Sequence, residues 1–387
     1  MNDALFDFDT PIDRNATSSE KWDKYQGRDI IPLWVADMDF RSPPAVITAL
    51  HERIEHGVFG YTHPPQGLVE AVLDHLERDF GWPVQPEWLV WLPGLVCGLN
   101  VLSRGVGEAG DEVITFTPIY PPFLSAPPLS QRTTVKVPLQ LYNNCWVADL
   151  EALERAITPR TKLLLLCSPH NPVGRAWTKD ELQQFAAVAE RHDLVIGSDD
   201  IHAGLILDEG ARHLPIASLS PETARRTITL LAPSKTYNIP GLGCSFAVIS
   251  DPALRRGFIK AAGRIVPHVN LLGYTAAEAA YRHGEEWRQA LLSYLRGNRD
   301  LVEESIGRIP GLTTYHVEAT YLAWIDTRAA GIDNPGRFFE EAGVGLSNGA
   351  DFDAPGFVRL NFGCTRALLK EALQRMEQAL RHHYHVS

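Results

Sequence analysis

The chain of 387 residues has no long hydrophobic run and no excess of positive charge. No apolar stretch approaches the roughly 18 residues that a membrane-spanning helix needs, so membrane insertion is not expected. The 36 lysines and arginines are outnumbered by 47 aspartates and glutamates, and the formal net charge of −11 disfavours binding to nucleic acid. The acidic opening, Met1 to Asp7, lacks the pattern of a signal peptide. We therefore expect a cytoplasmic protein with neither a membrane nor a nucleic acid as partner.

Cysteine is also scarce. The five cysteines are odd in number, widely spaced, and form no CxxC pair. This spacing excludes the common paired-cysteine zinc sites and is typical of a reduced, cytoplasmic protein. The fourteen histidines are scattered along the chain, and we predict no metal site.

The length of the chain predicts a large domain, a smaller one and a cleft between them, because 387 residues are too many for one simple core. Between about residues 86 and 250, short apolar runs alternate with helical patterns, which is typical of a parallel sheet with helices on both faces. The predicted strands lie at 89–92, 113–116, 163–166, 194–196, 228–231 and 246–249. A capping box of Thr178 and Glu181 is expected to begin the helix between the third and fourth strands.

After about residue 275 the pattern changes to long helices, and short strands follow near 321–325 and 358–362. This change predicts a smaller α+β domain. The domain boundaries are set at 1–44 for an N-terminal segment that packs with the small domain, 45–284 for the large domain and 285–387 for the small domain.

Chemically capable residues follow several predicted strands, at the edge where ligands bind in an open parallel sheet. Lys235 comes shortly after the run at 228–231. A lysine at the end of a buried strand can lose its proton and attack a carbonyl such as that of pyridoxal phosphate, whereas most lysines in such turns are simply solvated. Asp199 follows the run at 194–196, and a buried carboxylate there needs a positive partner. A pyridinium nitrogen would be that partner, with a helix cap or a salt bridge as the alternative.

Other strand ends carry weaker signals. The glycine turn before Leu95 and Val96 leads into a helix whose free N–H groups suit a phosphate. Tyr120 could lie over a flat ring or merely pack, and Asn171 could offer a side-chain donor or merely form a turn with the proline that follows it. Arg359 lies in an apolar strand pattern, where it would hold an α-carboxylate or form a structural ion pair.

Three motifs in register resemble the fold-type I pyridoxal-phosphate enzymes: SPHNPVG at 168–174, SDDIH at 198–202 and SKTYN at 234–238. Asn171 and Asp199 are 28 residues apart, and Asp199 and Lys235 are 36 apart, which are spacings typical of the aminotransferase class. More narrowly, nearly the whole chain is similar to the cystathionine β-lyase branch typified by MalY and PatB, also called C–S lyases. His202, where many aminotransferases have tyrosine, favours this branch. The segments that carry the resemblance are 32–40, 59–61, 120–123, 170–175, 199–202 and 238–242.

The resemblance implies an aminotransferase-like fold of type I, in which a mostly parallel seven-stranded sheet lies between helices beside a smaller α+β domain. It also implies a homodimer with shared active sites and pyridoxal 5'-phosphate as the cofactor. Lys235 would bind the aldehyde covalently, Asp199 the ring nitrogen, Asn171 the ring hydroxyl and Arg359 the substrate carboxylate, and Tyr61 would reach the phosphate of the neighbouring subunit. The implied residues are Lys235, Tyr120 and Asp199 for catalysis; Leu95, Val96, Tyr120, Asn171, Asp199, His202, Ser234, Lys235 and Tyr61 for the cofactor; and Arg359, Ala36, Tyr61 and Asn171 for the substrate.

Two positions depart from the wider pattern. Ala232 stands three residues before Lys235, where many fold-type I enzymes have a phosphate-binding serine, and Gly243 stands eight residues after it, where many aminotransferases have arginine. The phosphate site is therefore less completely assigned than the reactive lysine, and Ser234 is a candidate to compensate.

The implied reaction is α,β-elimination from L-cystathionine or a related S-substituted L-cysteine, which gives a thiol, pyruvate and ammonia. A class I/II aminotransferase would use the same lysine, aspartate and arginine, so these residues specify the cofactor better than the reaction. Two further alternatives are a related enzyme that acts on a cysteine S-conjugate in secondary metabolism and a regulatory binding protein without turnover.

Overall fold

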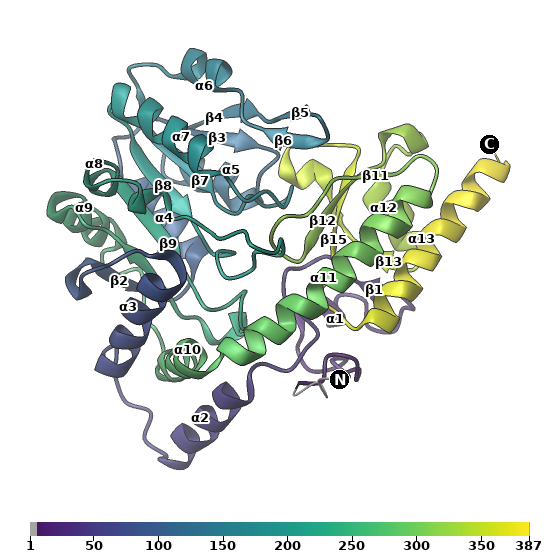
Figure 1. Ribbon diagram of the computed structural model, residues 1–387, viewed down its shortest axis with the longest axis horizontal. Helices are drawn as coiled ribbons and strands as arrows, with labels where there is room; N and C mark the ends of the chain where they lie inside the picture. The colour runs from purple at the N-terminus through teal and green to yellow at the C-terminus, as the bar shows by residue number, and fades with distance from the viewer. Residues whose placement is uncertain (1–5, 387) are drawn as a thin grey trace.

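The computed structural model describes residues 6–386, and its ribbon divides into a sheet-centred part and a C-terminal part with two long helices (Figure 1). The first five residues, which include most of the acidic opening, lie outside the described residues, as does residue 387.

The core of the larger part is a seven-stranded sheet in the order β2-β10-β9-β8-β7-β3-β4. Only β10 is antiparallel to its neighbours. The predicted mostly parallel sheet is therefore confirmed, and all six predicted strands are present. The bounds are Leu89–Leu92 (β2), Glu112–Thr117 (β3), Thr133–Pro138 (β4), Thr161–Cys167 (β7), Val195–Asp199 (β8), Thr227–Leu231 (β9) and Ser245–Val248 (β10).

Alternate side chains of the central strands face two different helical layers. On β7, Leu164 contributes to a core with Phe185 of α7 (Lys179–Arg191), whereas Leu165 contributes to a core with Leu99 of α4 (Leu95–Gly105) and Phe258 of α9 (Pro252–Ala262). Because both faces are covered, these strands are apolar at nearly every position, so they can be predicted from the sequence as continuous apolar runs. The edge strand β4 is largely exposed on one side, and its mixed pattern was not recognised as a strand.

The helices of the larger part begin at local signals. The capping box of Thr178 and Glu181 is present at the start of α7, as predicted. The bounds are Glu20–Asp23 (α1), Pro44–Glu55 (α2), Gln66–Phe80 (α3), Leu95–Gly105 (α4), Pro121–Leu129 (α5), Leu150–Ala156 (α6), Lys179–Arg191 (α7), Pro221–Arg225 (α8), Pro252–Ala262 (α9) and Leu271–His283 (α10). Across residues 6–386, every helix is too short or too polar to cross a bilayer.

The C-terminal part contains a four-stranded sheet in the order β11-β12-β15-β14, beside which α11 and α13 run (Figure 1). Its helices are Glu285–Arg308 (α11), Pro335–Glu341 (α12) and Arg366–Val386 (α13). Its strands are Thr313–Thr314 (β11), Leu322–Asp326 (β12), Val344–Gly345 (β13), Ser347–Asn348 (β14) and Phe357–Asn361 (β15), while β5 (Gln140–Tyr142) and β6 (Cys145–Val147) form a separate hairpin. The domain division at 44 and 284 stays a prediction.

The N-terminal segment is joined to the C-terminal part. Strand β1 (Ile31–Pro32) pairs in parallel with β13. Next to it, the fully buried Lys21 donates to Asp39 at 2.8 Å, and Arg14 forms ion pairs with Asp37 and Asp39. A buried cation of this kind is tolerated only with an anion beside it, so these pairs fix the segment in one position.

We predict that Asp39→Ala lowers the free energy of unfolding by about 3 kcal/mol, because the buried Lys21 ammonium would lose its carboxylate partner. The midpoint of urea unfolding measures the change. Glu151→Ala is the control, since it removes an exposed pair with Arg155 and should move the midpoint little. Equal urea midpoints for the two variants would contradict a stabilising role of the buried pair between Lys21 and Asp39.

Candidate active site

One cavity of about 280 Å³ lies beyond the carboxyl ends of the parallel strands. The strand register explains its position, because Asp199 pairs with Cys167 of β7 and Leu230 of β9, so the strands end side by side. The cavity brings together every predicted site residue except Tyr61. These residues are Ala36, Leu95, Val96, Tyr120, Asn171, Asp199, His202, Ser234, Lys235 and Arg359.

Lys235 lies in the turn after β9 and is surrounded by protein except where it faces the cavity. Its Nζ donates a hydrogen bond of 2.6 Å to the backbone oxygen of Ala36. Burial, together with the nearby Arg359, lowers the pKa of the amine to about 8 against the opposing fields of Asp37 and Asp199. A lysine with this pKa is partly neutral near physiological pH and able to act as a nucleophile or base.

Asp199 is the carboxylate that faces the cavity. Burial raises its pKa to about 7, although the Ile201 N–H, 3.1 Å from its Oδ1, opposes the shift. Asp199 has no ion-pair partner among residues 6–386, so the alternative of a structural salt bridge is not observed. Its neighbour Asp200 instead accepts hydrogen bonds from Ser198 and from His213 at 2.7 Å.

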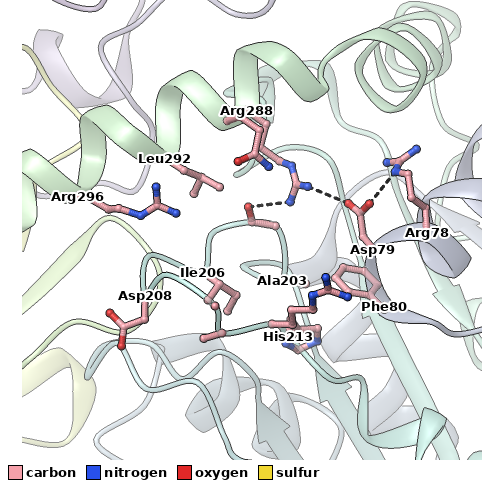
Figure 2. A pocket seen from close by; sticks show the side chains of 15 residues that line it. Arg78, Asp79, Phe80, Ala203, Ile206, Asp208, His213, Arg288, Leu292 and Arg296 are labelled. Atoms are coloured by element: carbon pink, nitrogen blue, oxygen red, sulfur yellow. Dashed lines mark hydrogen bonds and ion pairs between the residues drawn. The ribbon is translucent and has the colours of Figure 1, made fainter.

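The loop after Asp199 continues from the active cavity to a second one of about 290 Å³, shown in Figure 2. There Arg288 of α11 extends toward Asp79 at 3.1 Å and toward the backbone oxygen of Gly204. On the active side, burial holds the pKa of His202 well below its usual range, and its Nδ1 has no hydrogen-bond partner. The loop is thus fixed from behind and presents a neutral imidazole to the cavity.

Arg359 comes from β15 of the other sheet. Its Nη1 donates to Asn171 Oδ1 at 2.9 Å and its Nη2 to the Trp34 backbone oxygen at 3.0 Å. Burial lowers the pKa of this guanidinium to about 10. No carboxylate in the described part of the chain pairs with it, and its Nε has no partner. A buried cation without an anion suits a carboxylate ligand, which accepts two parallel hydrogen bonds.

The first turn of α4 forms part of the cavity wall. Its N-cap residue is Gly94, so no side chain accepts a hydrogen bond from the first N–H groups of the helix. Leu95 and Val96 line the cavity next to Ser234. Free N–H groups at a helix N-terminus bind phosphate well.

The two departures noted in the sequence have structural reasons. Gly243 has a φ of 59°, and an added Cβ would lie 3.0 Å from the backbone oxygen of Pro93, so an arginine would be strained there. Ala232 is buried in the apolar core that contains Leu99 and Leu230. Neither residue lines the cavity.

This set of donors fits pyridoxal phosphate. The cavity combines an uncapped helix N-terminus for the phosphate, an unpaired carboxylate for the ring nitrogen and a lysine with a lowered pKa for the aldehyde. Tyr120 lies beside these groups, and its backbone N–H donates to the Asn171 oxygen at 3.2 Å.

Some residues of the site were not foreseen, and one predicted residue lies elsewhere. The Tyr321 hydroxyl donates to the same Ala36 oxygen that Lys235 contacts, at 2.8 Å, but in the sequence Tyr321 is only an aromatic before an apolar run. Trp34 acts through its backbone oxygen, which no side-chain pattern reveals. Tyr61 is fully exposed and lines a different hollow with His268.

We predict that acetylation of Lys235 in cofactor-free protein follows a titration midpoint near pH 8, because burial disfavours its charged form. Arg359→Met should move the midpoint upward, since it removes a neighbouring positive charge. Mass spectrometry of peptides labelled with acetic anhydride over a pH series measures this, with the exposed Lys260 as a reference for reagent reactivity. A midpoint near the ordinary 10.5 would contradict the burial of the amine.

Comparisons with known proteins agree with this geometry. The model of the family "Aminotransferase class I and II" matches residues 28–376. Cystathionine beta-lyase PatB of Bacillus subtilis is 36% identical over 96% of this chain and 99% of its own. Among solved structures, OvoB is 48% identical with a TM-score of 0.95, over 97% of this chain and 99% of its own. Cystalysin from Treponema denticola, which contains pyridoxal 5'-phosphate, is 33% identical with a TM-score of 0.93, over 98% of this chain and 99% of its own.

These matches extend over nearly the whole chain and confirm the predicted fold and cofactor. The protein is a pyridoxal-phosphate-dependent enzyme with an aminotransferase fold of type I. The chain therefore belongs to the MalY and PatB family of C–S lyases, within the aminotransferases of class I and II.

Proposed function

We propose that this protein cleaves the carbon–sulfur bond of L-cystathionine or a related S-substituted L-cysteine. The observation that carries the proposal is the convergence of Lys235, Asp199 and the unpaired Arg359 on one cavity. The first two suit the cofactor, and the third suits the α-carboxylate of an amino acid. The kinship with cystathionine beta-lyases supports elimination over the other reactions that the same groups can perform.

The cofactor would be held by residues from five separate segments of the chain. Asp199 would pair with the ring nitrogen, Asn171 would bond the ring hydroxyl, and Tyr120 would stack on the ring. The N–H groups of Leu95 and Val96, with Ser234, would bind the phosphate, and His202 would complete the wall behind the ring. When bound, the cofactor supplies an electron sink for the electron pair that remains after a Cα proton is lost.

The protein's own groups then have separate tasks. Arg359 orients the substrate through its carboxylate, and Asp199 keeps a proton at the ring nitrogen. Lys235, once its amine is free, takes the Cα proton at Nζ. The Cβ–S bond breaks, and the sulfur leaves with the electron pair as a thiolate. With one water consumed, the net products are a thiol, pyruvate and ammonia.

A transamination would use the same residues but would need a keto acid to accept the amino group. The chain is also similar to a protein named for this reaction, an asparagine–oxo-acid transaminase of Streptococcus mutans, with 29% identity. The two reactions therefore differ in their co-substrate requirement, which an assay separates.

We also propose a homodimer in the cytoplasm. Val58, Phe59 and Tyr61 are exposed by 60% or more, which is unusual for three large apolar side chains within four residues and supports an interface there. Tyr61 would then reach the phosphate in the partner's site rather than in its own. The five cysteines are all free thiols, which supports a reducing compartment.

The purified enzyme with cofactor should release thiol and pyruvate in equal amounts from L-cystathionine with no keto acid present. Lys235→Ala should lower this rate by at least about 100-fold, since the base that removes the Cα proton is lost. It should also abolish the yellow absorbance band that borohydride bleaches in the wild type. Turnover only after a keto acid is added would favour the aminotransferase, and a colourless reconstituted wild type would rule out both.

Hybrid dimers test the role of Tyr61. Tyr61→Ala and Lys235→Ala proteins should each be impaired alone, but after they are mixed and allowed to exchange subunits, about a quarter of wild-type activity should return. The reason is that half of the dimers would be hybrids with one intact site. No recovery, with subunit exchange verified by mass spectrometry, would show that Tyr61 does not act across a dimer.

A further inference from the structure

A third cavity, of about 680 Å³, adjoins the active one. The two share part of their lining, namely Val35, Ala36, Lys235 and Pro240. Its volume lies within the range of roughly 300–1,000 Å³ that small-molecule sites occupy. Because Lys235 borders both spaces, a substrate whose Cα lies at Lys235 has room to extend its sulfur substituent into this third cavity.

The charged residues around this cavity fall into two groups. Arg14 and the buried Lys21 together neutralise Asp37 and Asp39, as described above. Glu20 and Arg41 also line the cavity, are exposed, and have no hydrogen-bond or ion-pair partner within residues 6–386. The cavity thus carries one free carboxylate and one free guanidinium.

The backbone that carries both charged residues is held in place by neighbouring contacts. Glu20 begins α1, whose N-cap Ser19 bonds the backbone of Trp22, and the adjoining Lys21 is fully buried against Asp39. Arg41 adjoins Ser42, which donates to the Asn238 backbone oxygen at 3.0 Å. Glu20 also contributes to raising the pKa of Tyr120, as expected of a carboxylate whose field reaches the active cavity. Charges on a fixed backbone select a ligand better than mobile surface charges do.

We propose that this third cavity binds the distal, zwitterionic end of the sulfur substituent, with Glu20 on its ammonium group and Arg41 on its carboxylate. The inference rests on the proposed C–S lyase function and narrows its substrate class. The preferred substrates are thioethers with an α-amino acid at both ends, rather than S-alkyl cysteines. A substituent without these charges leaves Glu20 and Arg41 unpaired and gains nothing from them.

Four substrates separate the two charges: L-cystathionine carries both distal groups, S-carboxymethyl-L-cysteine only a carboxylate, S-(2-aminoethyl)-L-cysteine only an ammonium, and S-ethyl-L-cysteine neither. For each enzyme variant, kcat/KM is divided by the value for S-ethyl-L-cysteine. The change in this ratio from wild type to variant cancels the intrinsic difference between the leaving thiols.

Arg41→Gln should lower the ratio about tenfold for L-cystathionine and for S-carboxymethyl-L-cysteine, which is the size expected for one lost charge-assisted hydrogen bond. Glu20→Gln should do the same for L-cystathionine and for S-(2-aminoethyl)-L-cysteine. Arg256→Gln on α9 is the matched control, because Arg256 is exposed outside the cavity and should leave every ratio unchanged.

A second readout does not depend on turnover. Calorimetry would measure the binding of L-cystathionine to the Lys235→Ala protein reconstituted with cofactor. Its dissociation constant should rise by a similar factor when Arg41→Gln or Glu20→Gln is added to Lys235→Ala. If both variants still release thiol but their kcat/KM ratios and dissociation constants are unchanged, the proposal of a distal site is wrong. A wild type that releases no thiol from any of the four compounds would instead overturn the proposed function itself.

Discussion

The burial of three ionisable groups in one cavity, without counter-ions at contact distance, is the constraint on which the site depends. Desolvation lowers the pKa of Lys235 to about 8 and of Arg359 to about 10, and it raises that of Asp199 to about 7. Such an arrangement is unfavourable until ligands supply the missing charges. A ring nitrogen for Asp199 and a carboxylate for Arg359 would do so, which is why the geometry specifies the kind of ligand.

The N-terminal segment contributes as much to this cavity as the sheet does. The backbone oxygen of Ala36 accepts from Lys235 and from Tyr321, and that of Trp34 accepts from Arg359. The segment holds these oxygens in place because β1 joins β13 and because Lys21 is buried. The same anchoring fixes the walls of the third cavity, so stability of the segment and choice of substrate are linked.

Much of the larger part was predictable because its determinants are local. Central strands covered on both faces are continuous apolar runs, and a capping box lies within four residues. The edge strand β4 was missed because its exposed side breaks the pattern, and the antiparallel direction of β10 has no signature in a single strand. The glycine at 243 departs from the wider sequence pattern, and its left-handed backbone explains why an arginine would be strained there.

The sequence by itself determined the reactive residues at the strand ends, since Asn171, Asp199 and Lys235 each follow a run that ends at the same edge of the sheet. The tertiary structure decided which groups meet them. Arg359 bonds Asn171 across 188 residues of chain, and Glu20 and Arg41 line a cavity beside Lys235 only because the N-terminal segment folds over that lysine. Contacts of this kind depend on how segments that are distant in the sequence pack together, and a local pattern of side chains does not predict that packing.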